Sequence, residues 1–325
     1  MKIVYLKPKS SLITELRSDT LWGLIITAIS HLYPDDVVNQ VLESYSGSTP
    51  SFLVSSAFPY KYEFGKRTLY FPKPLLKNDI EIPDSFTKEE KLLFMRNLKR
   101  NKKAKYITKE ILEKYLSGTL SDAEYFAGNT WSNQPKIKEK VVPHNTISRK
   151  TWTTLEIEDA GQLFTSQEMF MGNDYGLFFL VQGERLEYLD SALRLLSHIG
   201  FGGDISTGKG VCEIEFENDF TISQPNNADM FMVLSLYTPT VDEIEFFKYN
   251  SEKLTYEPEL RKGHVGRNVS KNHEKDAVLM FREGSVFPKM AKNLYGLNSV
   301  VRSMHDDLLY PVYHYGTAFY LNMKS

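Results

Sequence analysis

The stretch that decides the fold runs from Gly200 to Gly210 and reads GFGGDISTGKG, with five glycines in eleven residues. Glycine-dense loops often cradle phosphates, because no side chain blocks the approach to backbone N–H groups. Residues 203–209 match the P-loop pattern G-x-x-x-x-G-K, but Gly210 replaces the Ser or Thr that binds Mg²⁺. Gly200 and Gly202 begin a Rossmann fingerprint, but Ile205 stands at its third glycine.

The flanks of this loop exclude both nucleotide motifs. The preceding ERLEYLDSALRLLSHI (184–199) spaces its leucines along one helix face, and the following VCEIEF (211–216) alternates as a strand does. The order is therefore helix, loop, strand, whereas both motifs need strand, loop, helix. Gly200 is expected to end the helix. The other four glycines exceed what a helix end needs, so close approach of a ligand stays open.

Length and composition indicate an ordinary globular protein. The chain has 325 residues, 13% aromatic residues, a net charge of −2 and one cysteine, Cys212. That length suggests two domains, and one cysteine excludes a disulfide framework. The near-neutral charge means that any nucleic-acid contact is local. No long apolar run is present and MKIVYLKPKS (1–10) suits a first strand, so a cytoplasmic protein without a membrane partner is expected.

The N-terminal part alternates regular elements with an insertion. Residues 2–6 are expected to form a strand, and a helix should begin where Ser18 or Asp19 can cap it. Residues 74–130 change in character, with a charged segment, 89–115, that is expected to be helical. Its basic run from Arg96 to Lys105 is more typical of a solvated helix face than of an RNA site.

Residues 133–173 lack a long apolar run and carry threonines with spaced aromatics, which is typical of an extended, projecting hairpin. A strand at 175–181 follows. After QPNNAD (224–229) the pattern strand, helix, strand, strand recurs. We therefore expect an α+β fold of two small sandwiches, with a first domain over residues 1–222 and a second over 223–325.

The sequence carries no recognisable catalytic constellation. It has no H-E-x-x-H and no G-x-S-x-G motif, and no carboxylate cluster that indicates a bound metal. His31, His144 and His198 are the only early histidines that could serve a nuclease as base, and two of them fall in expected helices. No catalytic residue, metal or cofactor is therefore expected.

Four stretches in this order resemble the RAMP superfamily of CRISPR effector proteins. They are LRSDTLWGLI (16–25), FLVSSAFPY (52–60), PHNTISRKTWTT with GQLF (143–164), and the helix-led GFGGDISTGKG; the ending PVYHYGTAF (311–319) fits too. The match is nearest to the type III-A (Csm) subunit that caps the 5′ end of the guide RNA. The resemblance implies two ferredoxin-like (RRM-like) domains, a helical insertion and a β-hairpin thumb at 133–173.

The same resemblance implies an RNA-binding subunit that is not catalytic. It would hold the repeat-derived 5′ tag of the crRNA, contact the large polymerase-containing subunit and the first RAMP backbone subunit, and meet target RNA only indirectly. The loop would hold guide phosphates, and the N-terminus of the first helix suits a phosphate as well. The residues implied to contact RNA are Arg17, Ser18, His144, Asn145, Thr146, Ser148, Arg149, Gly200, Phe201, Gly202, Gly203, Asp204, Thr207, Gly208, Lys209, His314, Tyr315 and Gly316.

Two alternatives remain open at this point. The chain could be a RAMP endoribonuclease that processes repeat RNA with a histidine base, which would cleave without metal. It could also be a backbone subunit, which would polymerise along the guide.

Overall fold

The structure is a computed structural model. It describes residues 1–47, 49–75, 86–120, 124–125, 134–154, 156–157, 160–161, 163–263, 275–302 and 311–325. Within these ranges, no helix has both the length and the apolar character that crossing a membrane requires.

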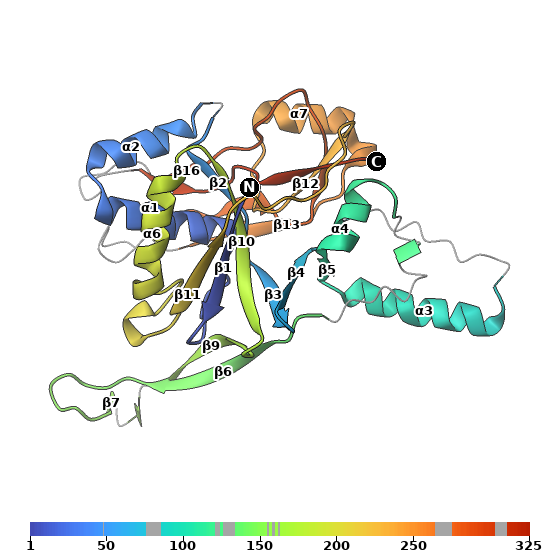
Figure 1. The fold of residues 1–325 in the computed structure, drawn as a ribbon. Coiled ribbons are helices and arrows are strands. Elements are labelled where there is room, and N and C mark those ends of the chain that lie inside the picture. The colour runs from blue at the N-terminus through green and yellow to red at the C-terminus, as the bar shows by residue number, and fades with distance from the viewer. Residues whose placement is uncertain are drawn as a thin grey trace.

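An antiparallel sheet of seven strands forms the centre of the N-terminal part (Figure 1). Its strands are β1 (Lys2–Pro8), β2 (Phe52–Val54), β3 (Phe58–Glu63), β4 (Lys66–Pro72), β5 (Tyr106–Thr108), β10 (Tyr175–Gly183) and β11 (Cys212–Glu217). The order is β11-β1-β10-β3-β4-β5, and β2 also pairs with β10. Strands β1, β2–β3, β10 and β11 thus stand in the order 4-1-3-2, which is the ferredoxin-like arrangement.

Helices cover one face of this sheet. They are α1 (Ser18–Leu32), α2 (Asp35–Ser44) and α6 (Leu186–Ile199). Because side chains of a strand alternate between faces, Val4 and Leu6 of β1 pack under the helices while Ile3 and Tyr5 face the other way. Helices α1 and α6 lie against each other across the buried leucines of α6, as the leucine spacing indicated.

The helical insertion is not one helix. Helix α3 (Lys88–Lys103) ends at Ala104, residues 106–108 form β5 against β4, and α4 (Lys109–Leu116) follows. The expectation of continuous helix over 89–115 was therefore wrong. Ile107 is fully buried in the sheet, and this tertiary pairing outweighs the local helix propensity of the segment.

The C-terminal part is smaller and, among its described residues, forms only part of the ferredoxin-like pattern, with one α-helix beside a three-stranded sheet. Its elements are β12 (Met230–Val233), α7 (Val241–Tyr249), β13 (Pro258–Arg261), β14 (Val278–Phe281), β15 (Val286–Pro288), β16 (Ser299–Arg302), β17 (Val312–His314) and β18 (Tyr320–Met323). The sheet order is β15-β12-β18, and residues 289–298 carry no second helix. The α+β fold class is confirmed, whereas the division at residues 222 and 223 stays a prediction.

The two parts share one hydrophobic core. The face of the first sheet that turns away from α1 and α6 packs with the C-terminal strands: Phe178 and Leu180 belong to the same buried cluster as Met232, Val286 and Leu321. Residues on both sides of the expected boundary therefore bury each other's apolar surface.

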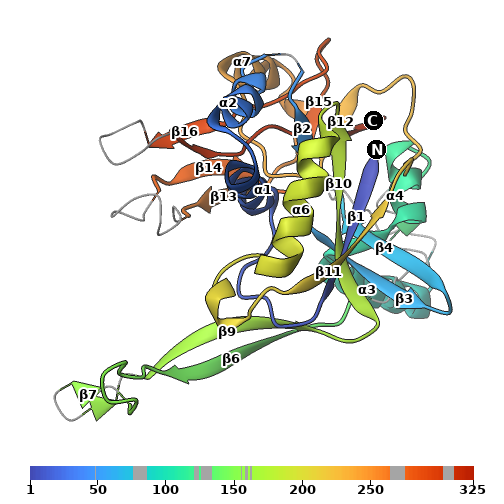
Figure 2. The ribbon, with the colours of Figure 1, turned by 60° about the vertical axis from the view of Figure 1, so that its left-hand side comes forward.

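The thumb is a long two-stranded arm. Strand β6 (Ile137–Asn145) pairs with β9 (Leu163–Met171) over nine residue pairs, and β7 (Glu156–Ile157) pairs with β8 (Ala160–Gly161) beyond them. Both ribbon views show the arm extending away from the body (Figure 2). The projecting hairpin expected at 133–173 is thereby confirmed in the described residues.

Candidate nucleic-acid interface

The glycine loop leaves α6 at Gly200, whose φ of +112° ends the helix as expected. Phe201 is fully buried and fixes the start of the loop in the core under the helices. A Cβ on Gly210 would lie 2.0 Å from the Phe201 carbonyl oxygen, so only glycine fits there. Packing therefore requires the two glycines at the loop ends.

The middle of the loop is exposed to solvent and presents backbone N–H donors. The Gly203 N–H donates to Thr14 Oγ1 at 3.2 Å, and a 3₁₀ turn covers Ile205–Thr207 between left-handed Asp204 and Gly208. Among the hydrogen bonds of the described residues, the N–H groups of Asp204, Ile205 and Ser206 have no protein acceptor. A Cβ on Gly208 would meet nothing within 4 Å. This part of the loop can receive an anion at its backbone.

The segment before α1 binds the C-terminal end of the loop. Gly210 N–H donates to the Ser11 carbonyl at 2.9 Å, and Val211 N–H donates to Ser10 Oγ at 3.0 Å. Residues 10–14 therefore belong to the same surface, although the sequence offered no motif that singles them out.

The expected site residues of the thumb lie at the outer end of the β6–β9 ladder, where His144 and Asn145 form its last two pairs, and not at its body end. His144 stacks on Phe164, with ring centroids 5.2 Å apart, and its Nε2 lies 2.7 Å from Ser166 Oγ. Asn145 donates to Thr154 Oγ1 at 3.3 Å, and the Ser148 N–H donates to the Thr153 carbonyl at 2.9 Å.

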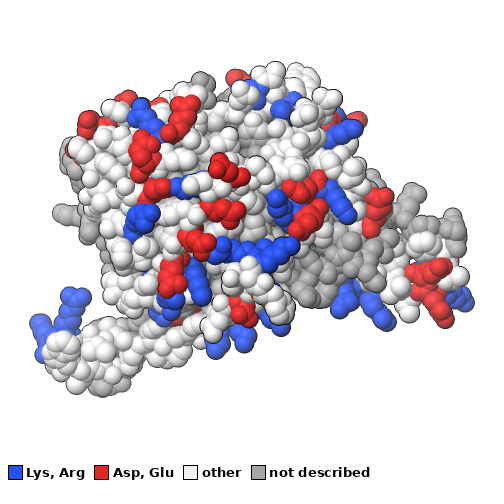
Figure 3. All heavy atoms as spheres, viewed as in Figure 1, with Lys and Arg blue, Asp and Glu red and all other residues white. Residues whose placement is uncertain are grey.

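Two basic residues are exposed near the tip of the arm. Thr146 is half-buried, whereas Arg149 and Lys150 are exposed. Figure 3 shows Lys and Arg at the end of the arm, while the face of the body carries both charges in alternation. The sequence of the arm also holds the acidic residues Glu156, Glu158 and Asp159, so the thumb as a whole carries no excess of positive charge.

Thumb and glycine loop meet at a buried carboxylate, Glu168 of β9. It accepts hydrogen bonds from Lys209 Nζ at 2.7 Å, from Ser11 Oγ at 2.5 Å and from Ser166 Oγ at 3.2 Å. His144 Nε2 lies 3.4 Å from its other oxygen. The bonds from Lys209 and the two serines hold the pKa of Glu168 down to about 2, so it is ionised near neutral pH.

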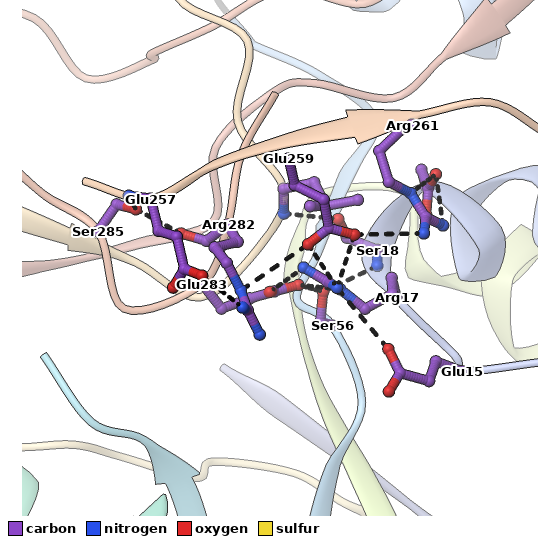
Figure 4. Close-up of polar contacts among 12 residues, drawn as sticks. Glu15, Arg17, Ser18, Ser56, Glu257, Glu259, Arg261, Arg282, Glu283 and Ser285 are labelled. Atoms are coloured by element: carbon purple, nitrogen blue, oxygen red, sulfur yellow. Dashed lines mark hydrogen bonds and ion pairs between the residues drawn. The ribbon is translucent and has the colours of Figure 1, made fainter. Parts of the chain in front are cut away.

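Arg17, which the resemblance implies to bind RNA, lies instead at the junction of the two parts (Figure 4). Its guanidinium donates to Glu283 at 2.9 and 2.5 Å and to Glu259 at 3.1 and 3.0 Å, and Ser56 also donates to Glu283. These carboxylates raise the pKa of Arg17 above its ordinary value against the opposing effect of burial. The donors of Arg17 are occupied by protein.

The next two residues lie at the same junction. Ser18 is fully buried, its Oγ accepting from the Leu236 N–H at 2.9 Å and its own N–H donating to Ser56 Oγ. Asp19 accepts from Arg261 at 3.0 and 3.1 Å. Neither side chain caps α1: Arg17 is the N-cap residue and no side-chain cap is present, so the capping expectation was wrong.

His314, Tyr315 and Gly316 lie in the interior. Tyr315 is fully buried and stacks on Trp22, with ring centroids 5.6 Å apart, and its hydroxyl accepts from the Val54 N–H at 3.2 Å. Burial, followed by the nearby Lys275, lowers the pKa of His314 to about 4, so it is neutral near pH 7. These groups present no polar side chain to a ligand in solution.

The structure therefore divides the expected residues into two groups. Lys209 of the loop meets the thumb at Glu168, where His144 lies 3.4 Å away, and Ser11 and Thr14, which the sequence reasoning missed, border the same region. Thumb residues 145–149 lie farther out along the arm. Arg17, Ser18 and residues 314–316 join the two parts of the chain. Among the described residues, no group of three His, Cys, Asp or Glu side chains is placed to hold a metal ion.

Comparison with known proteins gives consistent results. Residues 226–323 match the family model of the CRISPR Csm4 C-terminal domain. A curated protein of Thermococcus onnurineus (strain NA1), described as the CRISPR system protein Csm4, is 27% identical over 242 residues, which cover 73% of this chain and 74% of that protein.

Solved structures share the fold over the whole chain. A chain of the Csm3–Csm4 subcomplex from the type III-A CRISPR-Cas interference complex matches with a TM-score of 0.61 and 17% identity, covering 100% of both chains. A chain of the Csm1–Csm4 cassette in complex with cA4 matches with a TM-score of 0.59 and 21% identity, covering 99% of this chain and 97% of that one. Residues 226–323 thus match the Csm4 C-terminal domain model, and the whole chain resembles a curated Csm4 in sequence and shares its fold with chains of the Csm1–Csm4 and Csm3–Csm4 assemblies, in agreement with the resemblance that its sequence motifs carry.

Proposed function

We propose that this chain is the Csm4-type subunit of a type III-A CRISPR complex and binds the repeat-derived 5′ tag of the crRNA without cleaving it. The observation that supports this proposal most is the exposed middle of the glycine loop, where the N–H groups of Asp204, Ile205 and Ser206 have no protein acceptor among the described residues. This part of the loop lies next to the thumb, which Lys209 contacts at Glu168. Backbone donors recognise phosphate oxygens irrespective of base, as a subunit that holds a guide strand requires.

The partners follow from the relatives. The structures that match are described as assemblies of Csm4 with Csm1 and with Csm3. We propose the same two neighbours for this chain: the large polymerase-containing subunit and the first RAMP backbone subunit. Target RNA would then be met only through the guide.

The loop can be tested by adding charge without disturbing packing. Ser206 is exposed at the top of the loop, and Ser206→Asp places a carboxylate beside the proposed phosphates. One added repulsion of this kind should weaken binding of a tag-bearing RNA by about fivefold at low salt, roughly 1 kcal/mol for an exposed charge near 4 Å. Fluorescence anisotropy of a labelled RNA measures Kd. Ser251→Asp, an exposed serine of the C-terminal part, is the matched control.

The outcome separates the proposals. Equal Kd for Ser206→Asp and Ser251→Asp would remove the loop from the RNA site. A wild-type protein without measurable affinity for the tag RNA would contradict the proposed binding role.

One observation keeps the endoribonuclease alternative worth testing: His144 lies beside both a serine hydroxyl and the Glu168 carboxylate. Incubation of the protein with repeat RNA in EDTA measures this directly. Site-specific cleavage that His144→Ala abolishes would favour the nuclease, whereas intact RNA supports a binding role.

A further inference from the structure

Three segments far apart in the sequence meet at the Glu168 carboxylate. Glu168 lies on thumb strand β9, Ser11 precedes α1, and Lys209 ends the glycine loop. The Glu168 side chain is completely buried, whereas Lys209 is about a quarter exposed. Lys209 Nζ donates to Glu168 at 2.7 Å and also to Ser11 Oγ at 3.0 Å. Each segment is therefore tied to the other two through this cluster.

A buried carboxylate is unfavourable at a surface that receives phosphates, unless a cation neutralises it. Lys209 supplies that cation, and the hydroxyls of Ser11 and Ser166 satisfy the remaining oxygen positions. If Lys209 turned to a phosphate, Glu168 would remain as an unpaired charge in the interior, which is a costly state. The charge of Lys209 is thus used within the protein.

Among the described residues, the arm is also attached to the body by a backbone bridge and by apolar packing. Leu12 and Met169 exchange hydrogen bonds with N···O distances of 3.0 and 2.7 Å, next to Glu168, and Met169 and Met171 pack against the buried cluster under the helices. These contacts lie at the body end of the arm, and a two-stranded ribbon has little stability of its own. The ion pair adds a further attachment point on the side of the glycine loop, and this point holds the arm at one angle to the body.

We propose that Glu168 and Lys209 form a latch that fixes the angle between the thumb and the glycine loop. Both are positioning residues: Lys209 holds Glu168, and the loop receives phosphates through its N–H groups. The latch rests on the proposed function in one respect: the angle between thumb and loop determines how the guide RNA passes from the loop to the thumb. The fixed angle itself belongs to the protein without RNA.

The angle can be measured in the full chain without RNA. Spin labels on Lys150→Cys at the thumb tip and Asp36→Cys on α2 report the distance between arm and body by double electron–electron resonance. Both positions are exposed, and the native Cys212 is buried and stays unlabelled. Glu168→Gln should broaden or shift the distance distribution. Glu139→Gln, an exposed thumb carboxylate that accepts from Gln167, should leave it as in the wild type.

Variants of the second partner keep the latch testable if Glu168→Gln fails to fold. Lys209→Met should broaden the distribution, and Lys209→Arg should restore it, because a guanidinium can bind the same carboxylate. Wild-type distributions in both Glu168→Gln and Lys209→Met would overturn the latch.

Salt dependence of RNA binding distinguishes a latch from a phosphate ligand. A lost phosphate contact lowers the slope of log K against log salt by about 0.7 for single strands. Lys209→Met should weaken binding while the slope stays that of the wild type. A slope reduced by one contact would make Lys209 a phosphate ligand and overturn the latch. Failure of the wild type to bind tag RNA would instead overturn the proposed function, and the distance measurement would still decide the latch.

Discussion

At the scale of single residues, the glycine loop separates two uses of glycine. Gly208 and Gly210 both have positive φ, of +82° and +74°. A side chain at Gly208 would enter open space, whereas at Gly210 it would collide with the Phe201 carbonyl. The sequence shows five equivalent glycines, and only the packing of Phe201 reveals which ones the fold requires.

Alanine substitutions should make this difference measurable. Gly208→Ala should lower the free energy of unfolding by about 1–2 kcal/mol, the cost of a left-handed non-glycine residue. Gly210→Ala carries the same backbone cost and must also displace the chain at Phe201, so its loss should be clearly larger. Urea unfolding followed by circular dichroism measures both. Equal urea midpoints for the two variants would mean that the backbone at Phe201 moves aside without a cost in free energy.

The Glu168 cluster predicts how acid acts on the thumb. Since the folded-state pKa of Glu168 is lowered to about 2 from the ordinary 4.5, its contribution to stability is present above pH 4.5 and is lost as the pH falls from 4.5 toward 2. The hydroxyls of Ser11 and Ser166, which donate to the same carboxylate, carry no charge that could change in that window. The distance distribution of the spin-labelled pair should therefore stay narrow at pH 5. Broadening between pH 7 and pH 5 would show that another group controls the arm.

At the scale of elements, the apolar periodicity of the sequence is enough to predict a helix or strand that buries one regular face. Helix α6, strand β10 and the paired strands of the thumb could be predicted because their apolar spacing or their lack of a core is local. Strand β5 could not, because a three-residue strand between two helices forms only when β4 offers it a partner. Nor could the burial of Arg17 and Ser18, since the C-terminal part that covers them is more than 200 residues away in the sequence.

The tip of the thumb should be dispensable for folding. The described residues 149–153 are exposed and make hydrogen bonds only within the turn, so they bury no core. Replacing residues 150–162 by a short Gly-Ser linker should leave the melting temperature within about 2 °C of the wild type, as surface changes usually do. Differential scanning calorimetry measures this. A fall of 5 °C or more would show that the tip packs on the body.

The same deletion tests the thumb as a wedge. Chemical probing of guide nucleotides in the assembled complex should then change at the junction of tag and guide, where a wedge would displace a base. Overall tag affinity should persist, since the glycine loop is untouched. An identical reactivity pattern with and without the tip would remove the wedge role.

At the scale of the whole molecule, the N-terminal and C-terminal parts are not independent. Phe178 and Met232 lie in one buried cluster, and Tyr315 from the end of the chain packs on Trp22 of α1. Unfolding either part alone would expose apolar surface on the other, so the described body should unfold in one cooperative transition.

The ion pairs of Arg17 should be the most sensitive point of this junction. Arg17→Ala would leave Glu283, whose side chain is 8% exposed, with Ser56 as its remaining partner. Removing one member of a buried pair costs about 3–5 kcal/mol, and that loss should appear in the free energy of unfolding measured with urea. Arg185→Ala is the matched control, since the side chain of that exposed arginine donates to Gln40 and its backbone bond to Ser51 survives the change, so the variant should cost less than about 1 kcal/mol.

A second substitution shows whether the cost comes from the stranded charge. Adding Glu283→Gln to Arg17→Ala neutralises the carboxylate that the first change leaves unpaired, so the double variant should recover part of the lost stability. If Arg17 served RNA rather than the junction, the single variant would unfold like the wild type and would lose affinity for tag RNA. Because its guanidinium is filled by Glu259 and Glu283, we expect the opposite: a large loss of stability and, in the protein that remains folded, an unchanged salt slope.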